Sequence, residues 1–174
     1  MTHEDLYTEA ADRFGAIAKK YCGIVESASN FERPQLLEQI YDVLPALIDA
    51  AIHLPETNSL EDDTDNEVRE GASDVRPTRM DGHEWQKLYQ SLKDKLGDAD
   101  LYRMVFNAAK DAEAIHGSLA DDIADIYRDL KEGLILKDEA SPRNAIWEWR
   151  FGFDSHWGHH AIDALKAIHD IRNY

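Results

Sequence analysis

The sequence predicts an all-α fold, a single-domain helical bundle of about five helices that carries one long acidic loop. The chain of 174 residues has the usual length of one domain, so we expect one domain over residues 1–174. It contains only five prolines and nine glycines, too few for the many tight turns of a β-sandwich. Apolar residues recur at intervals of three and four over long segments, as in amphipathic helices.

Two amphipathic helices are predicted at the N-terminus. Over residues 6–25 the apolar residues fall on one helical face, which predicts the first helix. A second helix is expected to begin near Pro34, because proline suits the first turn of a helix, and to end before Pro55. Its apolar stripe comprises Leu37, Ile40, Tyr41, Leu44, Leu47, Ile48, Ala51 and Leu54.

Residues 56–80 differ in kind from the predicted helices. Acidic residues crowd this stretch, and it has almost no large apolar side chains, so it cannot anchor itself by burial. We expect a long, flexible acidic loop. Its acidic spacing from Asp63 onward also suggests a calcium-binding loop, but Val68 stands where the sharp turn of such a loop needs glycine. A solvated loop is therefore the favoured interpretation.

Two more helices are predicted beyond the loop, with an ambiguous stretch between them. Asp81 can cap a third helix, whose apolar stripe begins at Trp85 and which Gly97 closes. Residues 98–117 allow a short helix or a turn. Ser118 then suits the N-cap of a fourth helix. The apolar face of that helix comprises Leu119, Ile123, Ile126, Tyr127, Leu130 and Leu134.

The last predicted helix, about residues 143–172, carries the most informative pattern. It is apolar on two sides, which favours a place inside the bundle. Between those sides lie His156 and His160, whose spacing of four residues brings two imidazoles onto neighbouring turns, where they can share a metal ion. The fourth helix has an acidic ridge at one-turn intervals, formed by Asp122, Asp125 and Asp129. If the two helices pack side by side, imidazoles and carboxylates can meet.

Two interpretations of this meeting are open. In the first, Asp122, Asp125, His156 and His160 bind a divalent metal ion, and zinc, iron and manganese are the candidates because imidazole and carboxylate ligands suit them. In the second, these groups form a buried hydrogen-bond network with no metal. The metal interpretation predicts donor atoms that surround one point, whereas the network predicts direct hydrogen bonds.

Further residues are expected to belong to a structural network around these groups. Arg128 and Asp129 lie on the acidic face of the fourth helix. Arg150 falls near the apolar face of the last helix and needs an acidic partner, for which Asp122 or Asp125 is expected. The tryptophans Trp149 and Trp157 are expected to pack in the core, as aromatic residues at helical spacing usually do.

Residues 119–134 and 147–161 resemble the signature segments of a small bacterial family known only as a domain of unknown function. The resemblance covers nearly the whole chain and implies an all-helical, stand-alone domain, with no established activity. The positions that match its motif are Asp122, Asp125, Arg128, Asp129, Trp149, Arg150, His156, Trp157, Gly158 and His160.

A fainter similarity links the spacing of Asp122 and Asp125 to the all-α nucleotide pyrophosphohydrolases. Those enzymes need paired acids on a second helix to hold magnesium against a triphosphate. In this sequence Glu67 and Glu70 have the required spacing but fall in the predicted loop. The similarity therefore supports only a minor alternative.

Charge and composition restrict the partners and the compartment. Lys and Arg number 19 against 35 Asp and Glu, and the net charge of −16 would repel nucleic acid and anionic membrane surfaces. No stretch is long and apolar enough for a transmembrane helix, and the acidic N-terminus does not look like a signal peptide. Cys22 is the single cysteine and permits no intrachain disulfide. A cytoplasmic protein is expected.

The sequence contains no complete catalytic constellation, neither a phosphate-binding glycine loop nor a partnered nucleophile. The favoured function is therefore an interaction or regulatory module that binds a protein partner or forms a homo-oligomer. The alternative is a metal-dependent hydrolase, in which a metal-bound water is the nucleophile between the last two helices.

Overall fold

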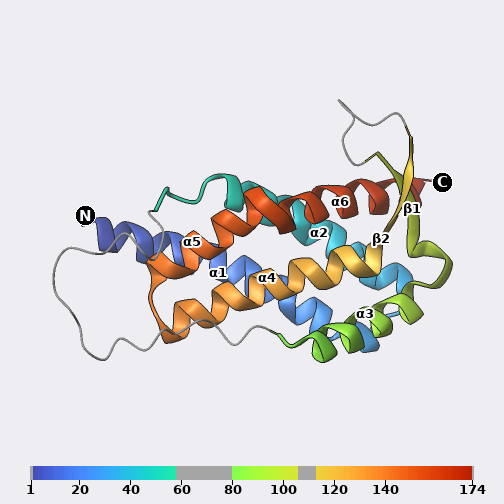
Figure 1. Cartoon of the computed structure of the whole chain (residues 1–174), viewed down its shortest axis with the longest axis horizontal. Helices are drawn as coiled ribbons and strands as arrows, with labels where there is room; N and C mark the ends of the chain where they lie inside the picture. Colours follow the sequence, from blue (N-terminus) through green and yellow to red (C-terminus); the bar gives the residue numbers. More distant parts are fainter. Residues whose placement is uncertain (1, 58–79, 106–112, 174) are drawn as a thin grey trace.

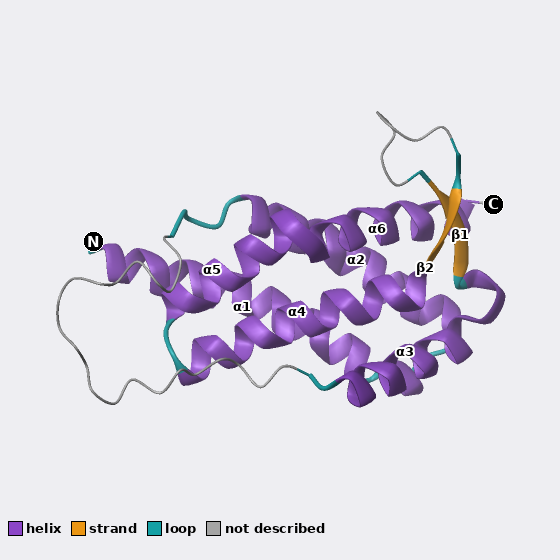
Figure 2. Ribbon diagram, viewed as in Figure 1, coloured by secondary structure: helices purple, strands orange, loops and turns teal. Residues whose placement is uncertain are grey.

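The computed structural model describes residues 2–57, 80–105 and 113–173. These residues form five helical rods and a small two-stranded antiparallel sheet, which confirms the predicted all-α bundle. The rods lie side by side along the long axis of the molecule, and the two strands stand at one end of it (Figures 1 and 2). The predicted acidic loop falls, over residues 58–79, outside the described residues.

The first two rods are α1 (His3–Glu26) and α2 (Arg33–Ile52), as the apolar periodicity predicts. Thr2 begins α1, because its hydroxyl accepts a hydrogen bond from the backbone of Asp5 while its own N–H donates to the Asp5 carboxylate. The two helices pack against each other and bury their apolar faces. Cys22 is part of this core, and burial raises the pKa of its thiol to about 12, which suits a filling role.

A β-hairpin replaces the short helix or turn that was expected after the third rod, α3 (Gly82–Leu96). Strands β1 (Leu101–Met104) and β2 (Ile115–Ser118) pair antiparallel. Asp100 helps to hold the two strands together, because its buried carboxylate accepts hydrogen bonds from the Ser118 hydroxyl and from the backbone N–H of Ala120. These bonds tie the start of β1 to the start of the next helix, and this long-range constraint left no local pattern in the sequence.

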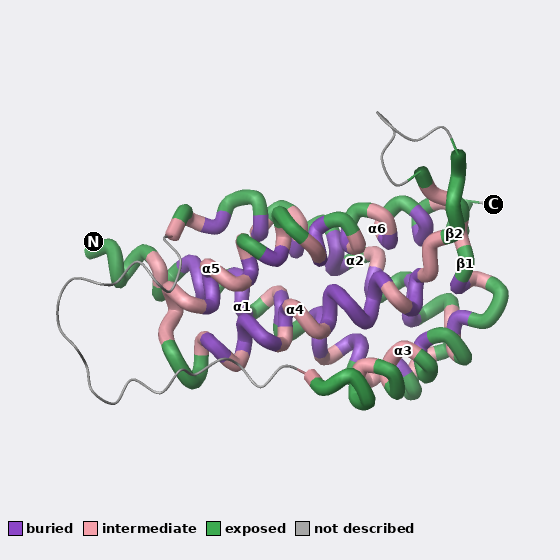
Figure 3. The backbone as a smooth tube through the Cα atoms, in the orientation of Figure 1, coloured by how far each residue is buried: buried purple, intermediate pink, exposed green. Residues whose placement is uncertain are grey.

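The central rod is α4 (Leu119–Glu139), which begins at Ser118 as predicted and packs against α1, α3, α5 and α6. Figure 3 shows an almost continuous run of buried residues along it. Buried positions include the charged side chains of Asp122, Asp125 and Glu132. Two acids of the predicted ridge, Asp122 and Asp125, therefore lie inside the bundle, and the third, Asp129, is partly buried.

The last rod is not the single helix that was expected over residues 143–172. It consists of α5 (Pro142–Gly152), the π-helical turn η3 (Phe153–Trp157) and α6 (Gly158–Asn173). Gly158 permits this turn, since a Cβ at that position would lie 2.2 Å from the carbonyl oxygen of Phe153.

The extra residue in the π turn also explains how both core tryptophans are buried. Residues eight apart lie about 80° apart around a regular α-helix, and one extra residue in a wide turn reduces this to about 20°. Trp149 and Trp157 thus share one face, and both are fully buried.

Among the described residues, no helix has the length and apolar character needed to cross a membrane.

Candidate metal site between the central and last rods

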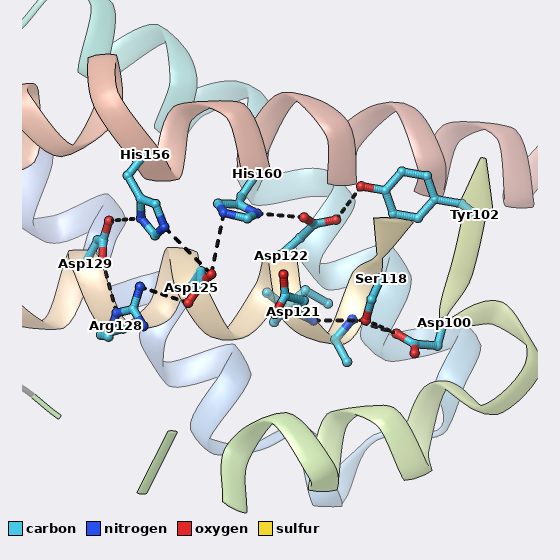
Figure 4. Close-up of polar contacts among 12 residues, drawn as sticks. Asp100, Tyr102, Ser118, Asp121, Asp122, Asp125, Arg128, Asp129, His156 and His160 are labelled. Atoms are coloured by element: carbon cyan, nitrogen blue, oxygen red, sulfur yellow. Dashed lines mark hydrogen bonds and ion pairs between the residues drawn. The ribbon is translucent and has the colours of Figure 1, made fainter. Parts of the chain in front are cut away.

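The carboxylates of α4 meet the imidazoles of the last rod in the middle of the bundle. Figure 4 shows His156 of η3 and His160 of α6 pointing toward α4, where Asp122, Asp125 and Asp129 point back at them. The two imidazole rings lie 4.9 Å apart, edge to face. The one-turn spacing on each helix thus places the predicted site residues together.

One nitrogen of each imidazole is hydrogen-bonded to a carboxylate. The Nδ1 atom of His156 lies 2.7 Å from Oδ2 of Asp129, and Nδ1 of His160 lies 2.8 Å from Oδ1 of Asp122. An ionised carboxylate can only accept, so both Nδ1 atoms must carry the proton and donate it. The Nε2 atoms are then available for another partner.

Both Nε2 atoms face the third carboxylate. Oδ2 of Asp125 lies 3.8 Å from Nε2 of His156 and 3.5 Å from Nε2 of His160. The other oxygen, Oδ1, is occupied, since it accepts from the indole N–H of Trp85 at 2.9 Å and from Arg128 at 2.9 Å. The carboxylate is therefore held so that its free oxygen points at the two imidazoles.

These distances suit a shared ion better than direct hydrogen bonds. Two donor atoms that bind one tetrahedral ion at about 2.1 Å lie about 3.4 Å from each other. The donor atoms of Asp125, His156 and His160 all lie within 4.8 Å of one another. A second group, formed by Asp121, Asp122 and His160, meets the same limit. In that group, however, His160 and Asp122 are already joined by a direct hydrogen bond, through Nδ1 of His160.

The electrostatics of the site favour a cation. Burial lowers the pKa of His160, but the hydrogen bond to Asp122 and the charges of Asp122, Asp125 and Asp121 together outweigh it and raise this pKa above its usual value. Burial also raises the pKa of Asp122, against the hydrogen bonds from His160 and Tyr102. The site therefore attracts positive charge, which a proton or a metal ion can supply.

The site is open to solvent on one side. The side chain of His156 is 40% exposed and that of His160 is 23% exposed, whereas Asp125 is 11% exposed. A polar pocket of about 400 Å³ lies next to His156, and its lining includes Arg128, Asp129 and Ser155. An ion held by Asp125, His156 and His160 would therefore be accessible to water and to small molecules.

Three residues of the predicted network, Arg150, Trp149 and Trp157, make their hydrogen bonds away from Asp125, His156 and His160. Arg150 was expected to pair with Asp122 or Asp125, and this was wrong, since it donates to the carbonyl of Leu54 and pairs with Glu56. It lies on α5, before the π turn, and faces the chain that leaves α2.

The two tryptophans of the predicted network bond to backbone. The indole of Trp149 donates to the carbonyl of Leu130, and that of Trp157 donates to the carbonyl of Trp149.

Two residues of the site were not found from the sequence. Trp85 was assigned only to the apolar stripe of its helix, and Tyr102 belongs to the stretch that was left ambiguous. Both reach the acidic ridge through their polar tips, Trp85 at Asp125 and Tyr102 at Asp122. No local signal marked them, because their contacts depend on how α3 and the hairpin pack against α4.

Comparisons with known proteins place the chain in a family. A search of curated proteins gives no match. The crystal structure of protein BF1032 from Bacteroides fragilis has a TM-score of 0.73 and 20% identity, over 92% of this chain and 90% of that chain, which shows a shared fold. The family model described as a domain of unknown function, DUF5063, matches residues 5–173. The resemblance noted in the sequence is thus confirmed, and the chain belongs to this family.

Proposed function

We propose that the protein binds a divalent metal ion through Oδ2 of Asp125 and the Nε2 atoms of His156 and His160. The observation that carries the proposal is the convergence of these three atoms, at 3.5 and 3.8 Å between nitrogen and oxygen, with both Nδ1 atoms occupied elsewhere. Two nitrogen lone pairs and an anionic oxygen that face one another repel unless a cation lies between them.

The surroundings of these atoms support the same conclusion. Histidine ligands of metal ions usually donate their second N–H to a carboxylate, and ligating carboxylates are themselves hydrogen-bonded. Here Asp129 and Asp122 accept the N–H of the two histidines. Trp85 and Arg128 donate to the carboxylate of Asp125. Asp122 is therefore assigned to orient His160 and not to bind the ion, although it was expected as a ligand.

Two imidazoles and one carboxylate suit zinc, iron(II) or manganese. Three protein ligands leave at least one position for water or for a substrate, as in catalytic sites. Such an ion can supply an activated water, which keeps metal-dependent hydrolysis as the chemical direction of the proposal. The pyrophosphohydrolase alternative is not favoured, because magnesium prefers oxygen ligands to imidazole. Its candidate second pair, Glu67 and Glu70, lies outside the described residues.

Metal analysis of protein purified without an affinity tag tests this proposal. We expect one equivalent of metal, or stoichiometric uptake of zinc or manganese by calorimetry, and loss of binding in His156→Ala and His160→Ala. His159→Ala is the matched control, since His159 is exposed and adjacent to His160 but is not part of the group that faces Asp125. No binding by the wild type, or equal loss in His159→Ala, would falsify the proposal.

The interaction module predicted from the sequence remains a second candidate. The observation that favours it is a set of exposed apolar side chains on the hairpin, at Leu101 (61%), Ile115 (48%) and Val105 (43%). A second copy of the chain is the simplest partner, and light scattering after size-exclusion chromatography tests it. A monomer at all accessible concentrations would rule out a homo-oligomer of this chain.

A further inference from the structure

The hairpin reaches the candidate metal site through one side chain. The hydroxyl of Tyr102 donates to Oδ2 of Asp122 at 2.7 Å, and the other oxygen of that carboxylate accepts from Nδ1 of His160 at 2.8 Å. Figure 4 shows the three side chains in a row, from β1 across the start of α4 to α6. A continuous chain of hydrogen bonds thus links the hairpin to an atom two bonds away from the proposed ligand nitrogen.

Gly117 is the residue that gives Tyr102 this position. The register of the hairpin places Gly117 directly opposite Tyr102. A Cβ at position 117 would lie 2.5 Å from Cζ of the tyrosine ring and 2.7 Å from its hydroxyl oxygen. Any larger residue would therefore push the tip of the ring away, and the tip is the part that contacts Asp122.

The three carboxylates of the site are held in the same manner. Asp129 uses one oxygen for His156 and the other for Nε of Arg128, at 3.4 Å. Asp125 uses Oδ1 for Trp85 and Arg128 and presents Oδ2 to the imidazoles. Tyr102 completes this pattern at Asp122, where it occupies the oxygen that His160 does not use. Each carboxylate is thus fixed by a donor on its second oxygen.

We propose that Tyr102 is a positioning residue of the metal site, which acts through Asp122 on His160, and that Gly117 is required to place it. This inference rests on the proposed metal binding. A carboxylate with one unpartnered oxygen can rotate and release Nδ1 of His160, so the imidazole loses the orientation that directs Nε2 toward Asp125. Burial, together with the charge and hydrogen bond of Asp122, raises the pKa of Tyr102, so its hydroxyl remains a donor.

The coupling must act in both directions. If the Tyr102 contact strengthens metal binding, bound metal strengthens the Tyr102 contact by the same factor. Metal binding at α4, η3 and α6 should therefore slow hydrogen exchange in β1 and β2, although neither strand supplies a ligand. The hairpin, with its exposed apolar side chains, would then report on the state of the site.

Zinc affinity of the full-length chain, measured by competition with a chromophoric chelator, tests the inference. We expect Tyr102→Phe and Gly117→Ala each to bind zinc about three- to tenfold more weakly than the wild type, since one hydrogen bond in the surroundings of the ligands is lost. The double variant should bind no more weakly than the weaker single variant, because both changes remove the same bond.

Matched controls exist for both substitutions. Tyr127→Phe removes a hydroxyl that donates to Glu26 at 2.9 Å, also at α4 but away from the site. Gly23→Ala adds a methyl group where no atom lies within 4 Å. Neither control should change the zinc affinity. Nitrogen-15 shifts of the His160 ring in metal-free protein provide a separate readout, since loss of the Tyr102 contact should reduce the fraction with the proton on Nδ1.

The outcomes separate the two proposals. A wild type that binds no zinc overturns both of them. A wild type that binds zinc while Tyr102→Phe binds it equally well and keeps the same ring shifts overturns the inference alone. Additive losses in the double variant overturn the role of Gly117. If Gly117→Ala fails to fold, Tyr102→Phe decides alone, since it removes a single oxygen atom.

Discussion

The central helix α4 meets the last rod in two stretches that are built on different principles. Toward the end of α4, Gly133 receives the indole of Trp149 so closely that a Cβ would lie 2.0 Å from Nε1. In the first half of α4, Asp122, Asp125 and Asp129 face two partly exposed imidazoles. The first stretch is specified by shape and excludes water, whereas the second is specified by charge and hydrogen bonds and is open to water.

The difference separates stability from function. A stretch that buries a large aromatic side chain in a glycine notch stabilises the fold and offers no free polar group. A stretch that concentrates carboxylates around imidazoles costs desolvation energy, and metal binding is the function that we propose for it. Substitutions in the two stretches should therefore have opposite profiles, one on the free energy of unfolding and the other on metal affinity.

Trp149→Ala should give the largest effect, on the first stretch. The side chain is fully buried, and removing it leaves a cavity between α4 and α5, so we expect a loss of about 3–5 kcal/mol in the free energy of unfolding. Urea denaturation measures this loss. A change below about 1 kcal/mol would show that the notch at Gly133 does not anchor the two helices.

Asp129→Ala should give the reverse profile, on the second stretch. It removes the acceptor of the Nδ1 proton of His156, so zinc affinity should fall about 10- to 100-fold, equal to about 1.4–2.7 kcal/mol. The free energy of unfolding without metal should change less than the affinity does. Equal zinc affinity for Asp129→Ala and the wild type would contradict the assigned role of Asp129.

The pH dependence should give the smallest effect, and it sharpens the comparison because His160 belongs to the second stretch. The pKa of His160 is raised in the folded protein, so its protonated form stabilises the metal-free fold below about pH 6.5, and this stabilisation is lost as the pH rises through the folded pKa. The difference in unfolding free energy between wild type and His160→Gln should thus be larger at pH 5.5 than at pH 8.5. A difference that grows with pH would contradict the raised pKa.

The sequence predicted the parts of the site that depend on a single helix. The spacing of Asp122, Asp125 and Asp129, and of His156 and His160, decides which face each side chain occupies, and helix packing then brings the faces together. The spacing could not decide which carboxylate takes Nδ1 and which faces Nε2, since three acids at intervals of about one helical turn look alike. That choice depends on how far one helix is shifted along the other.

The parts that sequence reasoning missed depend on long-range contacts or on an irregular turn. Tyr102 reaches Asp122 only because the hairpin pairs it with Gly117, and Trp85 reaches Asp125 from a helix 40 residues earlier in the chain. The π turn η3 has no periodic signature, because it is a single extra residue inside a helical pattern. Arg150 was assigned the wrong partner for another reason, since its neighbour Trp149 packs at Gly133, about two to three helical turns along α4 from Asp125 and Asp122.

The π turn fixes the phase of α6 relative to α5, because it absorbs one residue. If residues 153–157 became a regular α-helix with no residue lost, everything after them would rotate by about 100° relative to α5. His160 would then turn away from α4, although every candidate ligand would still be encoded. Deletion of one residue within the turn at the same time would restore the phase of α6, so the site depends on the turn and on the number of residues in it together, while the helical content stays almost the same.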